Sequence, residues 1–66
     1  MKCIYTKGNQ RITFNQLAAG DYEIEHMSYL TAYRYWGCRT RRTVPMAEAK
    51  EIMARLERKG YSVVRV

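Results

Sequence analysis

The chain has 66 residues, of which 12 are Lys or Arg and 6 are Asp or Glu, so its formal net charge is +6. A chain of this length forms one domain, residues 1–66, and a domain of roughly 60 residues buries only about 60% of its unfolded surface. The length excludes a two-domain enzyme, a doubly wound nucleotide-binding fold and a barrel that encloses a ligand. A hydrophobic content of 47% with 27% charged residues is typical of a folded protein.

The composition also indicates a cellular compartment. No apolar run approaches the roughly 18 residues of a membrane span, and the first residues do not resemble a signal peptide. We therefore expect a soluble, cytoplasmic protein without membrane contact. In that compartment Cys3 and Cys38 are predicted to be two reduced, buried thiols, with a disulfide between them as the alternative. Together with the single histidine, His26, they are too few for a tetrahedral zinc site, so no metal is expected.

The first half of the chain reads as extended segments joined by turns. The first sixteen residues predict a hairpin that turns at residues 7–10, where Gly8-Asn9 tolerates the positive φ of short hairpin turns. Residues 16–21 break the alternation as either one helical turn or a loop. Residues 22–27 alternate strictly, which places Tyr22, Ile24 and His26 on one face of a strand.

Residues 29–36 have high β-propensity and predict a further strand, followed by a turn at Trp36-Gly37 and another extended segment over residues 38–44. Alternation along the first of these strands would place its tyrosines on one face and Leu30, Ala32, Arg34 and Trp36 on the other. The second set suits a core.

One helix is predicted over residues 46–59. Its apolar side chains follow the i, i+3, i+4, i+7 rule and form one stripe, which consists of Ala49, Ile52, Met53 and Leu56. Gly60 is placed to end this helix in the left-handed conformation. Residues 61–66 then predict a closing strand whose middle is apolar on both faces, as in a central strand.

These elements predict an α+β fold. An antiparallel sheet of four or five strands, including the C-terminal strand, would have one face covered by the amphipathic helix. A single helix covers a single face, so the other face is left for solvent or a partner.

Charge is unevenly distributed along the chain. Residues 21–27 hold three acids and no Lys or Arg, whereas residues 28–45 hold four arginines and no acid. Tyrosine rings stack on bases and guanidinium groups bind phosphate, so tyrosines and arginines in one hairpin indicate a binding surface. The candidate binding residues are Tyr29, Tyr33, Arg34, Tyr35, Arg39, Arg41 and Arg42. The alternative is that the tyrosines form ordinary cross-strand pairs and the arginines solubilise an edge strand.

No feature of the sequence favours catalysis. Glu23 and Glu25 share a strand face, but His26 lies on the opposite one, and solvated carboxylates that pair across strands explain them better. The four glycines are isolated, so the chain has no Gly-rich phosphate loop and no cofactor is expected. We predict that the protein is not an enzyme.

Three extended segments followed by an amphipathic helix resemble, over residues 28–60, the arm-type DNA-binding domains at the N-terminus of phage and transposon integrases. The residues that carry the likeness are Tyr33-Arg34-Tyr35-Trp36-Gly37, Arg39-Thr40-Arg41-Arg42 and Ala47-Glu48-Ala49-Lys50. In that family the sheet enters the major groove, which implies this role for Arg34, Arg39, Arg41 and Arg42. By size and basic charge the chain also resembles small accessory proteins of phages and other mobile elements.

Two functions are consistent with these features. The first is a non-enzymatic nucleic-acid-binding module that holds DNA or RNA electrostatically, with low sequence specificity, on a basic, Tyr-rich open sheet face. The second is a small protein-binding inhibitor or adaptor, phage-encoded, that acts on a host protein complex of defence or nucleic-acid processing. A homodimer formed through an edge strand is compatible with both.

Overall fold

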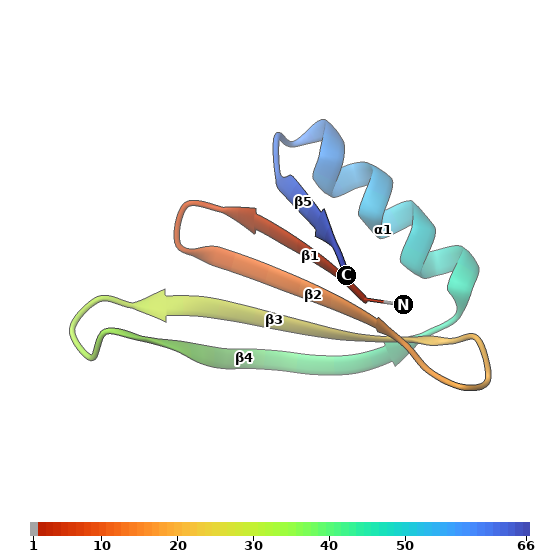
Figure 1. The fold of residues 1–66 in the computed structure, drawn as a ribbon, viewed down its shortest axis with the longest axis horizontal. Helices are drawn as coiled ribbons and strands as arrows, with labels where there is room; N and C mark the ends of the chain where they lie inside the picture. The colour runs from red at the N-terminus through yellow and green to blue at the C-terminus, as the bar shows by residue number, and fades with distance from the viewer. Residues whose placement is uncertain (1) are drawn as a thin grey trace.

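A computed structural model of the chain describes residues 2–66 and confirms the α+β fold (Figure 1). Five antiparallel strands form one sheet in the order β4-β3-β2-β1-β5, and one helix, α1, lies over part of one face. The elements are β1 (Lys2–Lys7), β2 (Gln10–Gln16), β3 (Tyr22–Leu30), β4 (Tyr35–Val44), α1 (Met46–Arg58) and β5 (Ser62–Arg65). Within residues 2–66, no helix has both the length and the apolar content needed to cross a membrane.

The core lies between α1 and the strands beneath it. Every second residue of the strands beneath α1 points toward the helix. These side chains pack against the predicted apolar stripe of α1. The buried core consists of Cys3, Tyr5, Phe14, Tyr22, Ile24, Val44, Ala49 and Leu56, with Ile52 and Met53 packed against it. The rings of Tyr5 and Phe14 pack edge-to-face, with centroids 5.4 Å apart, at its centre. We call this side of the sheet the helix face and the opposite side the open face.

Helix α1 ends as the sequence predicts. Gly60 adopts φ +90°, its N–H donates to the carbonyl of Glu57, and the N–H of Tyr61 donates to the carbonyl of Leu56, both at 3.1 Å. These two bonds form a Schellman motif, which satisfies the last carbonyls of the helix and requires a residue that tolerates positive φ. The chain therefore reverses at Gly60 and returns as β5.

Strand β5 is an edge strand, not a central one. It pairs only with β1, and Val64 on its open face is 59% exposed. The sequence predicts a helical turn or a loop at residues 16–21. In the structure Gln16 ends β2, and residues 17–21 form a turn closed by hydrogen bonds from Leu17 N–H to Asp21 O and from Gly20 N–H to Leu17 O.

The predicted strand over residues 29–36 is wrong, and so is the turn at Trp36-Gly37. The chain reverses at residues 31–34 instead, where the N–H groups of Tyr33 and Arg34 both donate to the carbonyl of Leu30. Gly37 lies within β4, where a Cβ would come within 2.9 Å of Leu30 Cδ1. The glycine thus permits a close cross-strand contact and does not mark a turn.

The β3–β4 hairpin extends beyond the rest of the sheet. Pairing between β2 and β3 begins at Gln10 and Ser28, and the N–H of Tyr29 donates to the carbonyl of Asn9 just beyond it. Residues 29–36, which we call the arm, project past the β1–β2 turn (Figure 1). The molecule is accordingly elongated, with extents of 38 × 23 × 19 Å.

Candidate functional site

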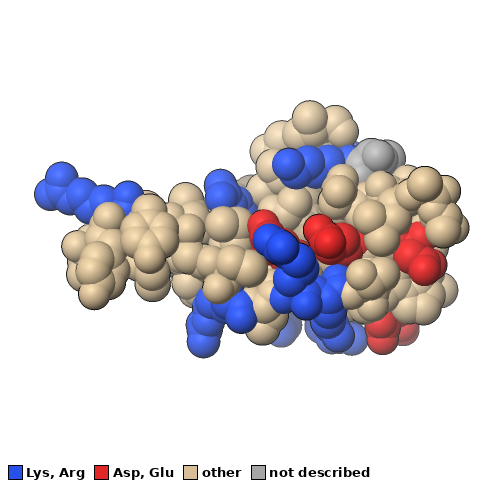
Figure 2. Space-filling model, turned by 90° about the horizontal axis from the view of Figure 1, so that it is seen from below, with Lys and Arg blue, Asp and Glu red and all other residues tan. Residues whose placement is uncertain are grey.

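The four candidate arginines lie along one border of the molecule. Strand β4 is the outermost strand on its side of the sheet, and the turn that precedes it forms the end of the arm. We call this border the arginine edge; it consists of Arg34, Arg39, Arg41 and Arg42, all of them exposed. Figure 2 looks toward this border and shows Lys and Arg side chains from the tip of the arm to the middle of the wider half, whereas Asp and Glu occur only in the wider half.

The arginines of this edge do not share a sheet face. Arg41 is paired with Glu25 and points to the open face, whereas Arg42 is paired with Ile24 and points to the helix face. Arg39 is the extra residue of a β-bulge, because His26 pairs with Thr40 and the next residue of β3 pairs with Cys38. The prediction of one basic open face is therefore corrected to a basic edge with side chains on both sides.

One of these arginines is neutralised within the molecule. Glu25 Oε2 accepts a hydrogen bond of 3.0 Å from Arg41 Nε and a second bond from the terminal nitrogen of the same guanidinium. These bonds and the carboxylate charge raise the pKa of Arg41. It is the only ion pair among residues 2–66, so Arg34, Arg39 and Arg42 have no acidic partner in the described part of the chain.

The tyrosines are also divided between faces, which corrects the prediction that they share the open one. Cross-strand partners in an antiparallel pair lie on the same face. Tyr29 pairs with Trp36 on the open face, and Leu30 pairs with Tyr35 on the helix face, beyond the reach of α1. Tyr33 lies in the turn, 73% exposed, with its ring centroid 6.1 Å from that of Tyr35.

Trp36, predicted to lie in the core, instead lies on the open face. Its ring packs edge-to-face on Tyr29, with centroids 5.4 Å apart, and the guanidinium carbon of Arg11 is 4.6 Å from its centroid. Arg11 Nη2 also donates to Met27 Sδ at 3.5 Å. This cluster joins β2, β3 and β4, and we call it the cation–π cluster (Arg11, Met27, Tyr29 and Trp36).

Sequence reasoning missed Arg11 as a candidate residue. Its contact with Trp36 depends on two pairings, Arg11 with Met27 and Tyr29 with Trp36, and the second of these requires the turn at residues 31–34. Strand alternation did place Glu23 and Glu25 on the face opposite His26, and this face is the open one. The same alternation, applied to β2 in the register of the β2–β3 pair, would have placed Arg11 on this face as well.

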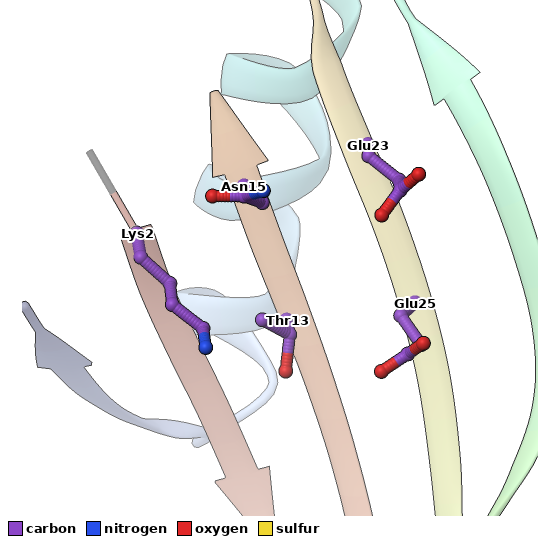
Figure 3. A pocket seen from close by; sticks show the side chains of 5 residues that line it. All are labelled: Lys2, Thr13, Asn15, Glu23 and Glu25. Carbon is purple, nitrogen blue, oxygen red and sulfur yellow. The ribbon is translucent and has the colours of Figure 1, made fainter. Parts of the chain in front are cut away.

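The half of the open face that lies away from the arm, which we call its inner half, contains a depression instead of an aromatic cluster. A depression of about 140 Å³ lies across β1, β2 and β3 (Figure 3). It is lined by Lys2, Thr13, Asn15, Glu23 and Glu25. Two carboxylates in this hollow repel phosphate groups, because like charges at close range are unfavourable. The open face is therefore basic and aromatic toward the arm, whereas the depression in its other half holds two carboxylates and one lysine.

His26 is half-buried and hydrogen-bonded to a neighbouring strand. Its Nε2 lies 2.7 Å from Gln10 Oε1, which also accepts a hydrogen bond of 3.2 Å from Ser28 Oγ. Because the amide oxygen can only accept, Nε2 is the donor of this hydrogen bond. This cluster lies on the helix face and joins β2 to β3.

The two cysteines are unpaired, as predicted, but only one is buried. Cys3 is in the core, whereas Cys38 is exposed on β4 beside the bulge. Among the described residues no group of three or more His, Cys, Asp and Glu side chains is arranged to hold a metal ion.

Comparison of the chain with protein-family models, with curated proteins and with solved structures gave no match. The site must therefore be interpreted from its own residues.

Proposed function

We propose that the protein is a non-enzymatic module that binds DNA or RNA through the arginine edge and the arm. The observation that carries this proposal is that three arginines of the edge are exposed and not ion-paired. Arg34, Arg39 and Arg42 are exposed on one border and have no acidic partner within residues 2–66. A solubilising surface normally mixes both signs of charge, whereas the narrower half of this border shows Lys and Arg side chains without Asp or Glu (Figure 2).

The side chains of the edge match the chemistry of a nucleic-acid backbone. Guanidinium groups bind phosphate oxygens through two parallel hydrogen bonds. The exposed rings of Tyr33 and Tyr35 at the end of the arm can stack on bases, an interaction worth about 1–3 kcal/mol per base. Phosphate contacts carry no sequence information, so this composition favours low sequence specificity.

Salt dependence tests this proposal directly. The affinity of the protein for fluorescently labelled single- and double-stranded probes would be measured by anisotropy at several salt concentrations. Each phosphate neutralised on a duplex contributes about −0.9 to the slope of log K against log salt, so three or four contacts predict a slope of about −2.7 to −3.6. Absence of binding, or a slope near zero, would contradict the proposal.

A protein partner is the second candidate function, and the end of the arm favours it. Leu30, Tyr33 and Tyr35 are 37%, 73% and 53% exposed there, and tyrosine is enriched among the residues that dominate protein interfaces. An inhibitor or adaptor of a host protein complex would use this tip as its anchor. A partner retained after nuclease treatment, and lost on Tyr33→Ala, would favour this function over nucleic-acid binding.

A further inference from the structure

Two arginines point to the open face, and they differ in their partners: one is paired with a carboxylate and the other is not. Arg11 comes from β2 and Arg41 from β4, and strand β3 runs between them. Arg11 lies over an aromatic ring and Arg41 lies on a carboxylate. This contrast predicts that the two residues behave differently toward an anionic ligand.

Arg11 is held in place without being neutralised. Its guanidinium lies 4.6 Å from the centroid of Trp36, and one terminal nitrogen donates to the sulfur of Met27, a weak and uncharged acceptor. No acidic side chain of the described chain forms an ion pair with it. A stacked guanidinium loses little further side-chain freedom when it binds, so its full charge and its remaining donors are available to phosphate.

Arg41 has its charge and its donors engaged. Two of its nitrogens donate to Glu25 Oε2, and Glu23 lies on the same face beside the depression of the inner sheet. A phosphate approaching Arg41 must displace Glu25 and also meet the repulsion of both carboxylates. The side chains of this ion pair are 60% and 25% exposed, so replacing the carboxylate leaves Arg41 free to reach a phosphate.

We infer that Arg11 is the phosphate-binding position of the open face and that Glu25 withholds Arg41 from this role. The inference rests on the proposed function and extends it, since it names a contact outside the arginine edge and a residue that limits the footprint. Nucleic acid would contact the open face at the cation–π cluster and end before the depression.

Replacement of the Glu25 carboxylate is expected to create a new phosphate contact at Arg41. Glu25→Gln keeps the size of the side chain, frees Arg41 and lowers the negative potential of the inner face. One additional neutralised phosphate makes the salt slope on duplex steeper by about 0.9, and a charge-assisted contact raises affinity by about tenfold. Glu51→Gln, on the exposed side of α1, changes the net charge equally and serves as the control.

The experiment measures probe affinity and salt slope for Arg11→Ala and Arg41→Ala, each in the wild-type and the Glu25→Gln chain. In the wild-type chain, Arg11→Ala is expected to weaken binding about tenfold, since it loses one charge-assisted contact. Arg41→Ala is expected to weaken it no more than Arg58→Ala, a charge-matched change on α1. In the Glu25→Gln chain, Arg41→Ala should cancel the gain in affinity and the steeper slope.

Trp36 supplies a second readout, because it is the only tryptophan of the chain. Binding of nucleic acid at the cation–π cluster should change its fluorescence emission in the wild-type protein. Arg11→Lys keeps the charge but loses the planar stack, so its affinity should lie between those of wild type and Arg11→Ala.

Failure of this inference is distinguishable from failure of the proposed function. If the wild-type protein shows no salt-dependent binding, the proposed function fails and this inference fails with it. If the protein binds, but Arg41→Ala weakens wild-type binding as much as Arg11→Ala does, only this inference is overturned. Unchanged Trp36 emission in the complex, or equal effects of Glu25→Gln and Glu51→Gln, would also overturn it.

Discussion

The phenol of Tyr5, wholly buried on β1, donates a hydrogen bond of 3.1 Å to Oε2 of Glu57 in the last turn of α1. The contact joins a strand inside the sheet to the end of the only helix of the described chain, 52 residues further along. Burial first, and the carboxylate second, raise the pKa of Tyr5 to about 12. Both causes disfavour the phenolate in the folded state.

Stability should therefore fall at high pH through Tyr5. A tyrosine has a pKa of about 10 in the unfolded chain, and a raised folded value stabilises the protein fully below that pH. The contribution is lost as pH rises from about 10 to about 12 and amounts to roughly 1–3 kcal/mol.

Urea unfolding at pH 8 and pH 11.5 checks this expectation against Tyr5→Phe. The substitution removes one hydrogen bond, which costs about 0.5–1.5 kcal/mol at pH 8. The variant should lose less stability than wild type between the two pH values. Equal losses in both proteins would show that other groups determine the alkaline transition.

The helix stripe should dominate stability in proportion to its burial. Leu56 is 7% exposed, so Leu56→Ala removes core packing and is expected to cost about 2–5 kcal/mol. Leu17, in the turn before β3, is 38% exposed, and Leu17→Ala makes the same chemical change at the surface. Thermal unfolding followed by circular dichroism should show a large decrease in Tm for Leu56→Ala alone. Similar decreases for both would contradict the assigned core.

The backbone is strained at Arg34, at the end of the arm. Arg34 adopts φ +57°, and it is the only non-glycine residue with positive φ among the described residues. This conformation costs about 1–2 kcal/mol for a residue with a Cβ, and glycine adopts it freely. Arg34→Gly should therefore raise Tm slightly, or leave it unchanged, while nucleic-acid affinity falls. A lower Tm together with unchanged nucleic-acid affinity for Arg34→Gly would contradict this expectation.

The cysteines should differ in reactivity because one is exposed and one is in the core. A thiol reagent applied to the native protein should modify Cys38 rapidly and Cys3 only after unfolding, since access limits reaction. Mass spectrometry of the briefly treated protein should find one modification per chain, and Cys38→Ser should abolish it. Rapid modification of the Cys38→Ser variant would mean that the core opens readily.

The sequence predicts best what depends on local periodicity. Helix α1 and the Gly60 end were identified because an apolar stripe and a single left-handed residue are local signals. The β3–β4 turn was misplaced because Thr31-Ala32-Tyr33-Arg34 has no turn residue, whereas Gly37 looks like one. Gly37 instead lies within β4, where the Leu30 side chain packs close to it across the strand pair, a position visible only once the register is known.

That misplaced turn also determined how much of the site could be predicted. The arginines were identified correctly as a basic segment, but the faces of Tyr35 and Trp36 were exchanged. The side of a strand on which a residue lies follows from counting along it, so the error in the turn reverses the assignments that follow it up to the bulge at Arg39. The cation–π cluster of Arg11 and Trp36, which spans three strands, depends on that register.

The most direct test of the central claim, that the arginine edge binds nucleic acid, compares two charge-matched triple variants. Arg34→Ala/Arg39→Ala/Arg42→Ala removes three arginines from the edge, and Lys50→Ala/Arg55→Ala/Arg58→Ala removes three positive charges from α1. Anisotropy titrations on one duplex probe at several salt concentrations would be run for both. We expect the edge variant to lose most affinity, with a salt slope shallower by about 2.7 units, and the helix variant to change little. Equal losses in the two variants would contradict the claim, because net charge alone would then explain the binding.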